Sequence, residues 1–239
     1  IVPECLELDT EILHQFHDRS KMMMGILPTG TVPHEPKQRL SSVFWSLPSH
    51  QLNNFLHNSQ AHSDWLNQVS KRWKPAADWL EQVIAQPEQK SQWLTANYRD
   101  VVLSKFGEGR IGVMGDAAHA MSPQLGQGAN MALLDAWALG QAVQSARKNE
   151  ALDYVQLWQT YHQHRQSSTA FYQFLSRLLT PLYQSDLWWA GGLRDLSFAW
   201  MYRIPYFRKE MAVTISGLKL GMFSQMNYRD IAKQNNHSV

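Results

Sequence analysis

Cysteine is almost absent from this chain of 239 residues, which has a single cysteine, Cys5. One thiol cannot form an internal disulfide, which fits a reducing compartment, so we expect a cytoplasmic protein. No basic residue lies close to Cys5 in the sequence to favour its thiolate form. We therefore expect this thiol to be inert.

Long apolar runs and a strong excess of charge are lacking as well. No run approaches the roughly 20 apolar residues that a membrane-spanning helix needs, and no signal peptide is visible. Lys and Arg number 22 against 20 Asp and Glu, a formal net charge of +2. So weak a field argues against nucleic acid as a partner.

The residues that are present predict three regions. The length suffices for one large domain or two small ones. Residues 1–106 read as a sheet with a helical insert, 107–150 as strand, loop and buried helix, and 151–239 as helices. The fold class is therefore α/β, or α+β for this chain taken alone.

The first region has both strand and helix signals. Runs rich in β-forming residues predict strands at Met22–Leu27, which ends at the turn signal Pro28–Gly30, at Leu40–Leu47 and at Tyr98–Phe106. Between them, from residue 50 to about residue 86, apolar residues fall at helical spacing, and Pro75 breaks or opens a helix.

One segment, Gly109 to Trp137, carries the chemistry. Its residues Ile111–Met114 predict a short buried strand, and Asp116 follows directly. Open α/β sheets place ligand-binding side chains at that end of a strand. Asp116 is therefore a candidate acceptor for a sugar-like hydroxyl.

The second part of this segment predicts a glycine-rich loop that leads into a helix. Gly126 and Gly128 let the backbone approach a flat ligand closely. The helix, from about Ala129 to Arg147, points its free N–H groups and positive dipole end at that ligand. Because its apolar residues cover most of its circumference, we expect it to be buried on nearly all sides.

This segment closely resembles the second FAD-binding motif of the aromatic-hydroxylase (class A) family of flavoprotein monooxygenases. The family pattern is G-D-A-A-H, then a proline, then G-x-G-x-N at the head of a helix. The matching residues are Gly115-Asp116-Ala117-Ala118-His119, Pro123 and Gly126-Gln127-Gly128-Ala129-Asn130. The resemblance covers about residues 20–145, including a substrate-domain sheet around MGILPTG and VFWSLP.

The resemblance implies a role for each matching residue. In the family the aspartate binds the ribityl chain of FAD, the proline lies beside the flavin ring and the glycine-rich helix start faces its pyrimidine edge. Those roles fall on Gly115 and Asp116, on Pro123, and on Gly126 to Asn130. The helix start from Gly128 to Met131 would stabilise the anionic reduced flavin.

The resemblance also implies which parts of the family's fold are lacking. The chain opens on IVPECLEL and has neither an N-terminal strand–GxGxxG–helix unit nor the family's middle Asp-Gly motif. We therefore expect a partial FAD-binding monooxygenase fold, a C-terminal fragment whose N-terminal Rossmann half is missing. Alone, it is expected to bind FAD weakly and to be inactive.

The expected activity is NAD(P)H-driven hydroxylation or epoxidation of a small apolar, aromatic substrate by an FAD-dependent monooxygenase. Two alternatives stay open. A flavin-dependent reductase or halogenase shares the same loop, and a truncated scaffold without flavin would have no activity.

Several other patterns favour structural interpretations. Gly107–Gly112 matches G-x-G-x-x-G but opens a strand, so it predicts a hairpin rather than a dinucleotide fingerprint. His119 and Asp135 are expected to be buried and hydrogen-bonded. His14 and His17 have no further ligand cluster near them in the sequence. His162 and His164, two residues apart, point to different faces of a helix, so we predict no metal site.

The C-terminal segment, residues 187–226, combines aromatic residues with scattered Arg and Lys. Helical packing is the favoured explanation. Peripheral contact with a membrane surface, cover for a substrate pocket and a dimer contact stay open as alternatives.

Overall fold

The computed structural model describes residues 2–4, 8, 11–20, 22–84, 94–148 and 151–227. Cys5 lies outside the described residues. The chain divides into two compact units, one formed by residues 1–96 with 183–192, the other by 97–182 with 193–239. The domain limits predicted at residues 106 and 150 stay predictions.

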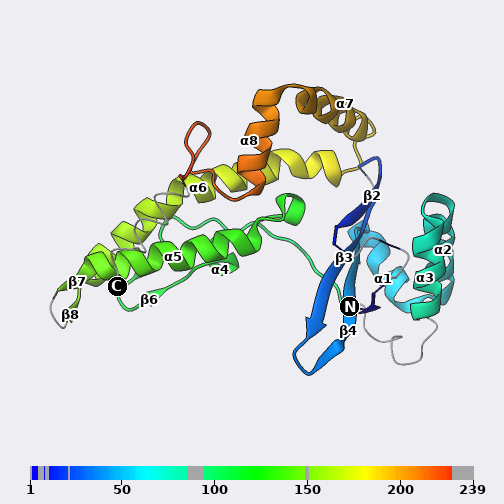
Figure 1. Cartoon of the computed structure of the whole chain (residues 1–239), viewed down its shortest axis with the longest axis horizontal. Coiled ribbons are helices and arrows are strands. Elements are labelled where there is room, and N and C mark those ends of the chain that lie inside the picture. The colour runs from blue at the N-terminus through cyan, green and yellow to red at the C-terminus, as the bar shows by residue number, and fades with distance from the viewer. Residues whose placement is uncertain are drawn as a thin grey trace. The chain divides into compact units, whose positions relative to one another are not determined.

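The first unit is a four-stranded antiparallel sheet of order β1-β4-β3-β2, with helices α1, α2 and α3 against one face (Figure 1). The strands are β1 (Val2–Pro3), β2 (His14–Asp18), β3 (Met22–Val32) and β4 (Glu35–Trp45). The helices are α1 (Ser49–His57), α2 (Ser59–Arg72) and α3 (Lys74–Ile84). The predicted sheet with a helical insert is thus confirmed.

Two local predictions in this unit have opposite outcomes. Pro75 lies in the first turn of α3, so it opens that helix as predicted. The predicted turn at Pro28–Gly30 is wrong, because β3 continues through it. A register shift between Pro28 and Gly30 absorbs the irregularity while β3 stays paired with β4.

Large apolar side chains fill the core between this sheet and its helices. Met24 and Ile26 of β3 pack with residues from all three helices, among them Phe55, Trp65 and Leu80. The indole rings of Trp45 and Trp65 are stacked, with centroids 4.0 Å apart and planes inclined by 10°.

In the second unit two long helices, α5 (Gly128–Ala146) and α6 (Tyr154–Tyr183), lie side by side (Figure 1). The small strands β7 (Arg147–Lys148) and β8 (Ala151–Leu152) pair between them. Helices α7 (Ala190–Arg203) and α8 (Pro205–Ile215) follow, which confirms the predicted helical C-terminal region. No described helix combines the length and apolar character that crossing a membrane demands.

Helix α5 buries one face only. Its fully buried positions recur at helical spacing and face α6: Met131, Asp135, Ala138, Ala142 and Ala146. Leu133 on another face is 69% exposed. The prediction that α5 is buried on nearly all sides is therefore wrong, since several of its positions are exposed.

Two predicted strands also differ from the structure. Tyr98–Phe106 forms no strand, because it lies against α4 (Asp116–His119) and α6 rather than another strand. The Val101 N–H donates to the Ala120 carbonyl at 3.0 Å and the Val101 carbonyl accepts from Gln173 at 2.5 Å, while Asp100 pairs with Arg177. The predicted buried strand Ile111–Met114 shrinks to β6 (Ile111–Gly112), in which Ile111 is 77% exposed. In the described residues β6 pairs only with β5 (Gly107–Glu108).

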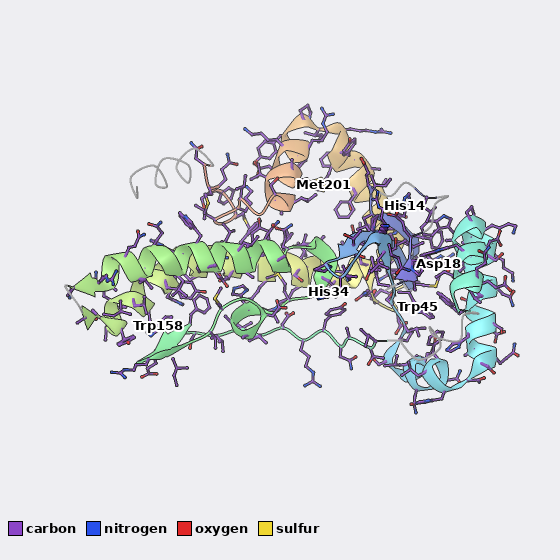
Figure 2. All side chains as sticks on the ribbon, turned by 60° about the horizontal axis from the view of Figure 1, so that its bottom comes forward. His14, Asp18, His34, Trp45, Trp158 and Met201 are labelled. Atoms are coloured by element: carbon purple, nitrogen blue, oxygen red, sulfur yellow. The ribbon has the colours of Figure 1, made fainter. Side chains whose placement is uncertain are left out.

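The hairpin predicted at Gly107–Gly112 is confirmed. Gly107 pairs with Gly112 across β5 and β6, and Gly109 turns the chain at φ +55°. The indole of Trp158 lies against both strands, and its Nε1 donates to the Gly109 carbonyl at 2.9 Å (Figure 2). This G-x-G-x-x-G segment therefore opens no helix.

Candidate functional site

The G-D-A-A-H residues form a single helical turn, α4 (Asp116–His119). Gly115 precedes it with φ 59° and ψ −141°, a conformation that side chains disfavour, so glycine is required there. Asp116 is the first residue of the turn and its side chain is exposed. Among the residues that the structure describes, none donates a hydrogen bond to its carboxylate.

The glycine-rich loop brings the chain back to this carboxylate. Pro123 is exposed and begins the short helix η2 (Pro123–Leu125), and Gly126 ends it in the left-handed conformation at φ 62°. Helix α5 then starts at Gly128. A Cβ atom placed on Gly128 would lie 3.9 Å from Oδ1 of Asp116. The exposed carboxylate therefore lies beside the start of α5.

The first turn of α5 is open. The Met131 N–H donates to the Gln127 carbonyl at 2.9 Å, so the three preceding N–H groups, Gly128 to Asn130, have no helical acceptor. Gly128 has no side chain, and the described atoms around it would leave room for one, so the space beside this turn is open. This combination of free donors, positive dipole end and open space fits a flat, partly anionic ligand.

Other predicted site residues turn their side chains into the protein. Gln127 is buried, and its Nε2 donates to the Ile215 carbonyl at 2.7 Å while its Oε1 accepts from Asn130 at 3.2 Å. The Met131 side chain is fully buried. The Gln127 side chain thus joins the loop to the end of α8, and Asn130 supports it. Ala129 is exposed.

A buried carboxylate lies directly behind the loop. Asp135 is 0% exposed, and its Oδ2 accepts from the Gly115 N–H at 2.7 Å and bonds to Nε2 of His119 at 2.6 Å. Its Oδ1 accepts from Nε of Arg165 at 2.6 Å. His119 and Asp135 are thus buried and hydrogen-bonded, as predicted.

The partners of Asp135 keep it ionised. Burial by itself raises the pKa of Asp135, but hydrogen bonds from His119, Gly115 and Arg165 together hold it below its ordinary value. Tyr161 lies close by, and burial followed by the negative charge of Asp135 raises the pKa of its phenol. The phenol therefore stays protonated.

Arg165 was not predicted from the sequence. It is buried on α6 and also donates to Ser168 at 2.8 Å. The available signal was its position, because it falls on the buried stripe of α6 with Leu157, Tyr161 and Tyr172. A charged residue on such a stripe indicates a buried partner.

No metal centre is found in the described part of the chain, where no three His, Cys, Asp or Glu side chains cluster. His162 packs its ring on Phe106 with centroids 5.0 Å apart, and His164 is exposed. These placements agree with the predicted packing and surface roles.

A family model described as "FAD binding domain" matches residues 47–171, which is more than half of the chain. The chain belongs to this family. FAD is the cofactor that the family name specifies, so the family resemblance seen in the sequence is confirmed.

Relatives of known function align with part of the chain. Zeaxanthin epoxidase of an Oncidium hybrid cultivar is 30% identical over 115 residues, which is 46% of this chain and 17% of that protein. Zeaxanthin epoxidase of Solanum lycopersicum is 32% identical over 107 residues, 42% of this chain and 16% of that protein. The chain thus spans about a sixth of their length.

Solved structures share the fold over about half of their own length. PqsL, a probable FAD-dependent monooxygenase from Pseudomonas aeruginosa, matches with a TM-score of 0.58 and 16% identity over 85% of this chain and 50% of that chain. Klebsiella pneumoniae HpxO, complexed with FAD and uric acid, matches with a TM-score of 0.54 and 18% identity over 87% of this chain and 49% of that chain. The partial FAD-binding monooxygenase fold expected from the sequence is confirmed.

Proposed function

We propose that this chain supplies the flavin-ring side of an FAD-dependent monooxygenase. The proposed reaction is NAD(P)H-driven hydroxylation or epoxidation of a small apolar, aromatic substrate. Membership of the FAD-binding family supports the cofactor. The observation that carries the site is the exposed Asp116 carboxylate beside the open first turn of α5.

The residues of the loop fit the ring and sugar-like chain of a flavin. The Asp116 carboxylate would accept a hydrogen bond from a ribityl hydroxyl. The N–H groups of Gly128 to Asn130 would stabilise negative charge on the reduced ring. Pro123 and Gly126 would border the ring, and Gly115, Gln127 and Met131 would contribute through the shape of the backbone.

FAD, when bound, supplies the redox chemistry that lets dioxygen react with an organic substrate. The proposed role of this chain is to position the flavin, to exclude water from it and to stabilise negative charge on its reduced ring. We assign no catalytic base: Asp116 is proposed to bind the ribityl chain, and the buried His119 is bonded to Asp135. The single cysteine supports the proposal that the protein works in the cytoplasm.

The decisive experiment replaces Asp116 in the full-length protein. Asp116→Ala should lower the affinity for FAD by roughly 10- to 100-fold, because a charge-assisted hydrogen bond is lost. Asp64→Ala, at an exposed position on α2, is the matched control and should bind FAD like the parent protein. Unchanged flavin affinity in Asp116→Ala would disprove the site.

Two further measurements separate the alternatives. Incorporation of label from ¹⁸O₂ into product is expected of a monooxygenase, and its absence would favour the reductase or halogenase. Flavin absorbance in the purified full-length protein is expected, and a colourless protein that takes up no FAD would favour the scaffold.

A further inference from the structure

The buried Asp135 contacts both ends of the one-turn helix that carries Asp116. Its Oδ2 accepts the N–H of Gly115, directly before α4, and bonds to the side chain of His119, the last residue of α4. A single helical turn has no stability of its own in water. One carboxylate oxygen therefore fixes both ends of this turn.

Arg165 holds that carboxylate in place and balances its charge. Its Nε bonds to Oδ1 at 2.6 Å, and both side chains are almost completely buried. An uncharged amide at position 135 would bring an NH₂ donor against the N–H of Gly115 or against Arg165. The geometry thus requires a carboxylate rather than a group of the same shape.

We propose that Asp135, held by Arg165, is a positioning residue that orients Asp116 for the flavin. The proposal rests on the proposed function, since Asp116 is its point of action. Asp135 and Arg165 lie behind the turn and need not touch the cofactor. Their effect on FAD should pass through residues 115–119 and the Asp116 side chain.

A double-mutant cycle in the full-length protein tests this proposal. FAD dissociation constants are measured for the parent, Asp135→Asn, Asp116→Ala and the double variant. Asp135→Asn should weaken FAD binding roughly tenfold in the parent and less than about twofold when Asp116 is already Ala. An equal loss in both backgrounds, or no loss in the parent, would overturn the positioning role.

The two proposals fail in different ways. If Asp116→Ala weakens FAD binding while Asp135→Asn acts equally in both backgrounds, the flavin site stands and the positioning role falls. If Asp116→Ala has no effect, both fall.

A second variant covers the case in which Asp135→Asn does not fold. Arg165→Lys keeps the charge but loses the Nε contact. It should speed amide hydrogen exchange in residues 115–120 without flavin, and it should weaken FAD binding. Arg177→Lys on the same helix, whose pair with Asp100 is exposed, is the matched control. Equal exchange in both variants would contradict the proposal.

An independent observation concerns the exposed apolar face of α7. Leu193, Leu196 and Trp200 recur at i, i+3 and i+7 and are 50%, 72% and 58% exposed. Exposed Tyr202 and Tyr206 follow at the junction with α8. These apolar side chains therefore lie along one side of α7 and are exposed to solvent.

The charges around this face are positive. Arg203, Arg208 and Lys209 are exposed and have no acidic partner among the described residues, whereas Asp195 pairs with Arg194 and Glu210 with Lys219. Apolar and aromatic side chains interleaved with unpaired cations suit the interface of an anionic bilayer. We infer that α7 and α8 lie on such a bilayer surface.

Vesicle partitioning of the full-length protein tests this inference. Binding is expected to vesicles of phosphatidylcholine with phosphatidylglycerol, to weaken with salt, and to be weak with phosphatidylcholine alone. Trp200→Ser should reduce binding, and Arg203→Gln should reduce it about fivefold. Arg99→Gln, at an exposed position before the flavin loop, should leave it unchanged. No vesicle binding, or loss of Trp200 exposure in a stable dimer, would refute the inference.

Discussion

The cores of the two units of this chain contain different kinds of contact. In the first, stacked indoles and aliphatic side chains fill the space between sheet and helices. In the second, alanines of α5 pack against Leu157 and Tyr161 of α6, and the buried Asp135–Arg165 ion pair joins the same two helices. The first interior depends on buried apolar area, whereas the second depends also on the hydrogen bonds of a buried ion pair.

The largest effect is expected from removing the buried carboxylate. Asp135→Ala leaves Nε of Arg165, the Gly115 N–H and Nε2 of His119 without their partner, and should lower the free energy of unfolding by about 3 to 5 kcal/mol. Urea denaturation measures the change. A loss below about 1 kcal/mol would mean that the buried pair is not a main support of this unit.

A cavity in the apolar interior of the first unit should cost slightly less. Leu80 is 1% exposed, and Leu80→Ala should remove about 3 kcal/mol from the free energy of unfolding. Because no titrating group takes part, the loss should be the same at pH 5 and pH 7. A clear pH dependence would weaken the contrast between the units.

Acid should affect the second unit first. The pKa of Asp135 is lowered in the folded state, so its contribution to stability is complete above the ordinary value of 3.8 and is lost as pH falls through the folded value. Peptide-resolved hydrogen exchange below pH 4 should show α5 and α6 opening before β3 and β4. Simultaneous opening, or the reverse order, would contradict this.

The smallest effects come from the same substitution at two glycines of the second unit. A Cβ at Gly112 would lie 2.1 Å from the Trp158 ring, so Gly112→Ala should cost about 2 kcal/mol through overpacking. Gly140 lies exposed within α5 with nothing within 4 Å, so Gly140→Ala should add up to about 1 kcal/mol. Thermal unfolding measures both changes. If the melting temperature shifted in the same direction in both variants, the contrast between overpacking at Gly112 and helix stabilisation at Gly140 would be wrong.

Local patterns in the sequence predicted most helices and the loop. Apolar spacing identified the helical insert of the first unit, and the G-D-A-A-H segment identified the loop that carries Asp116. These succeed because helical periodicity and glycine-rich turns are properties of short segments.

The errors concern contacts between distant segments. Tyr98–Phe106 has the composition of a strand, but Val101 bonds to α6 and to Ala120 after α4 rather than to another strand. The pairing of Asp135 with Arg165 joins residues 30 positions apart, and although the buried stripe of α6 indicates that Arg165 has a partner, no local pattern identifies Asp135 as that partner. How much of α5 is covered likewise depends on which elements surround it.

The hairpin of β5 and β6 has a consequence for how positions in this chain can vary. Gly107 and Gly112 lie opposite each other, and the Trp158 ring occupies the space of both missing side chains. A smaller residue at position 158 would make room for alanine at both glycines. The two glycines and position 158, which lies far from them in the sequence, should therefore change together, and an indole ring, not a nucleotide, accounts for this glycine spacing.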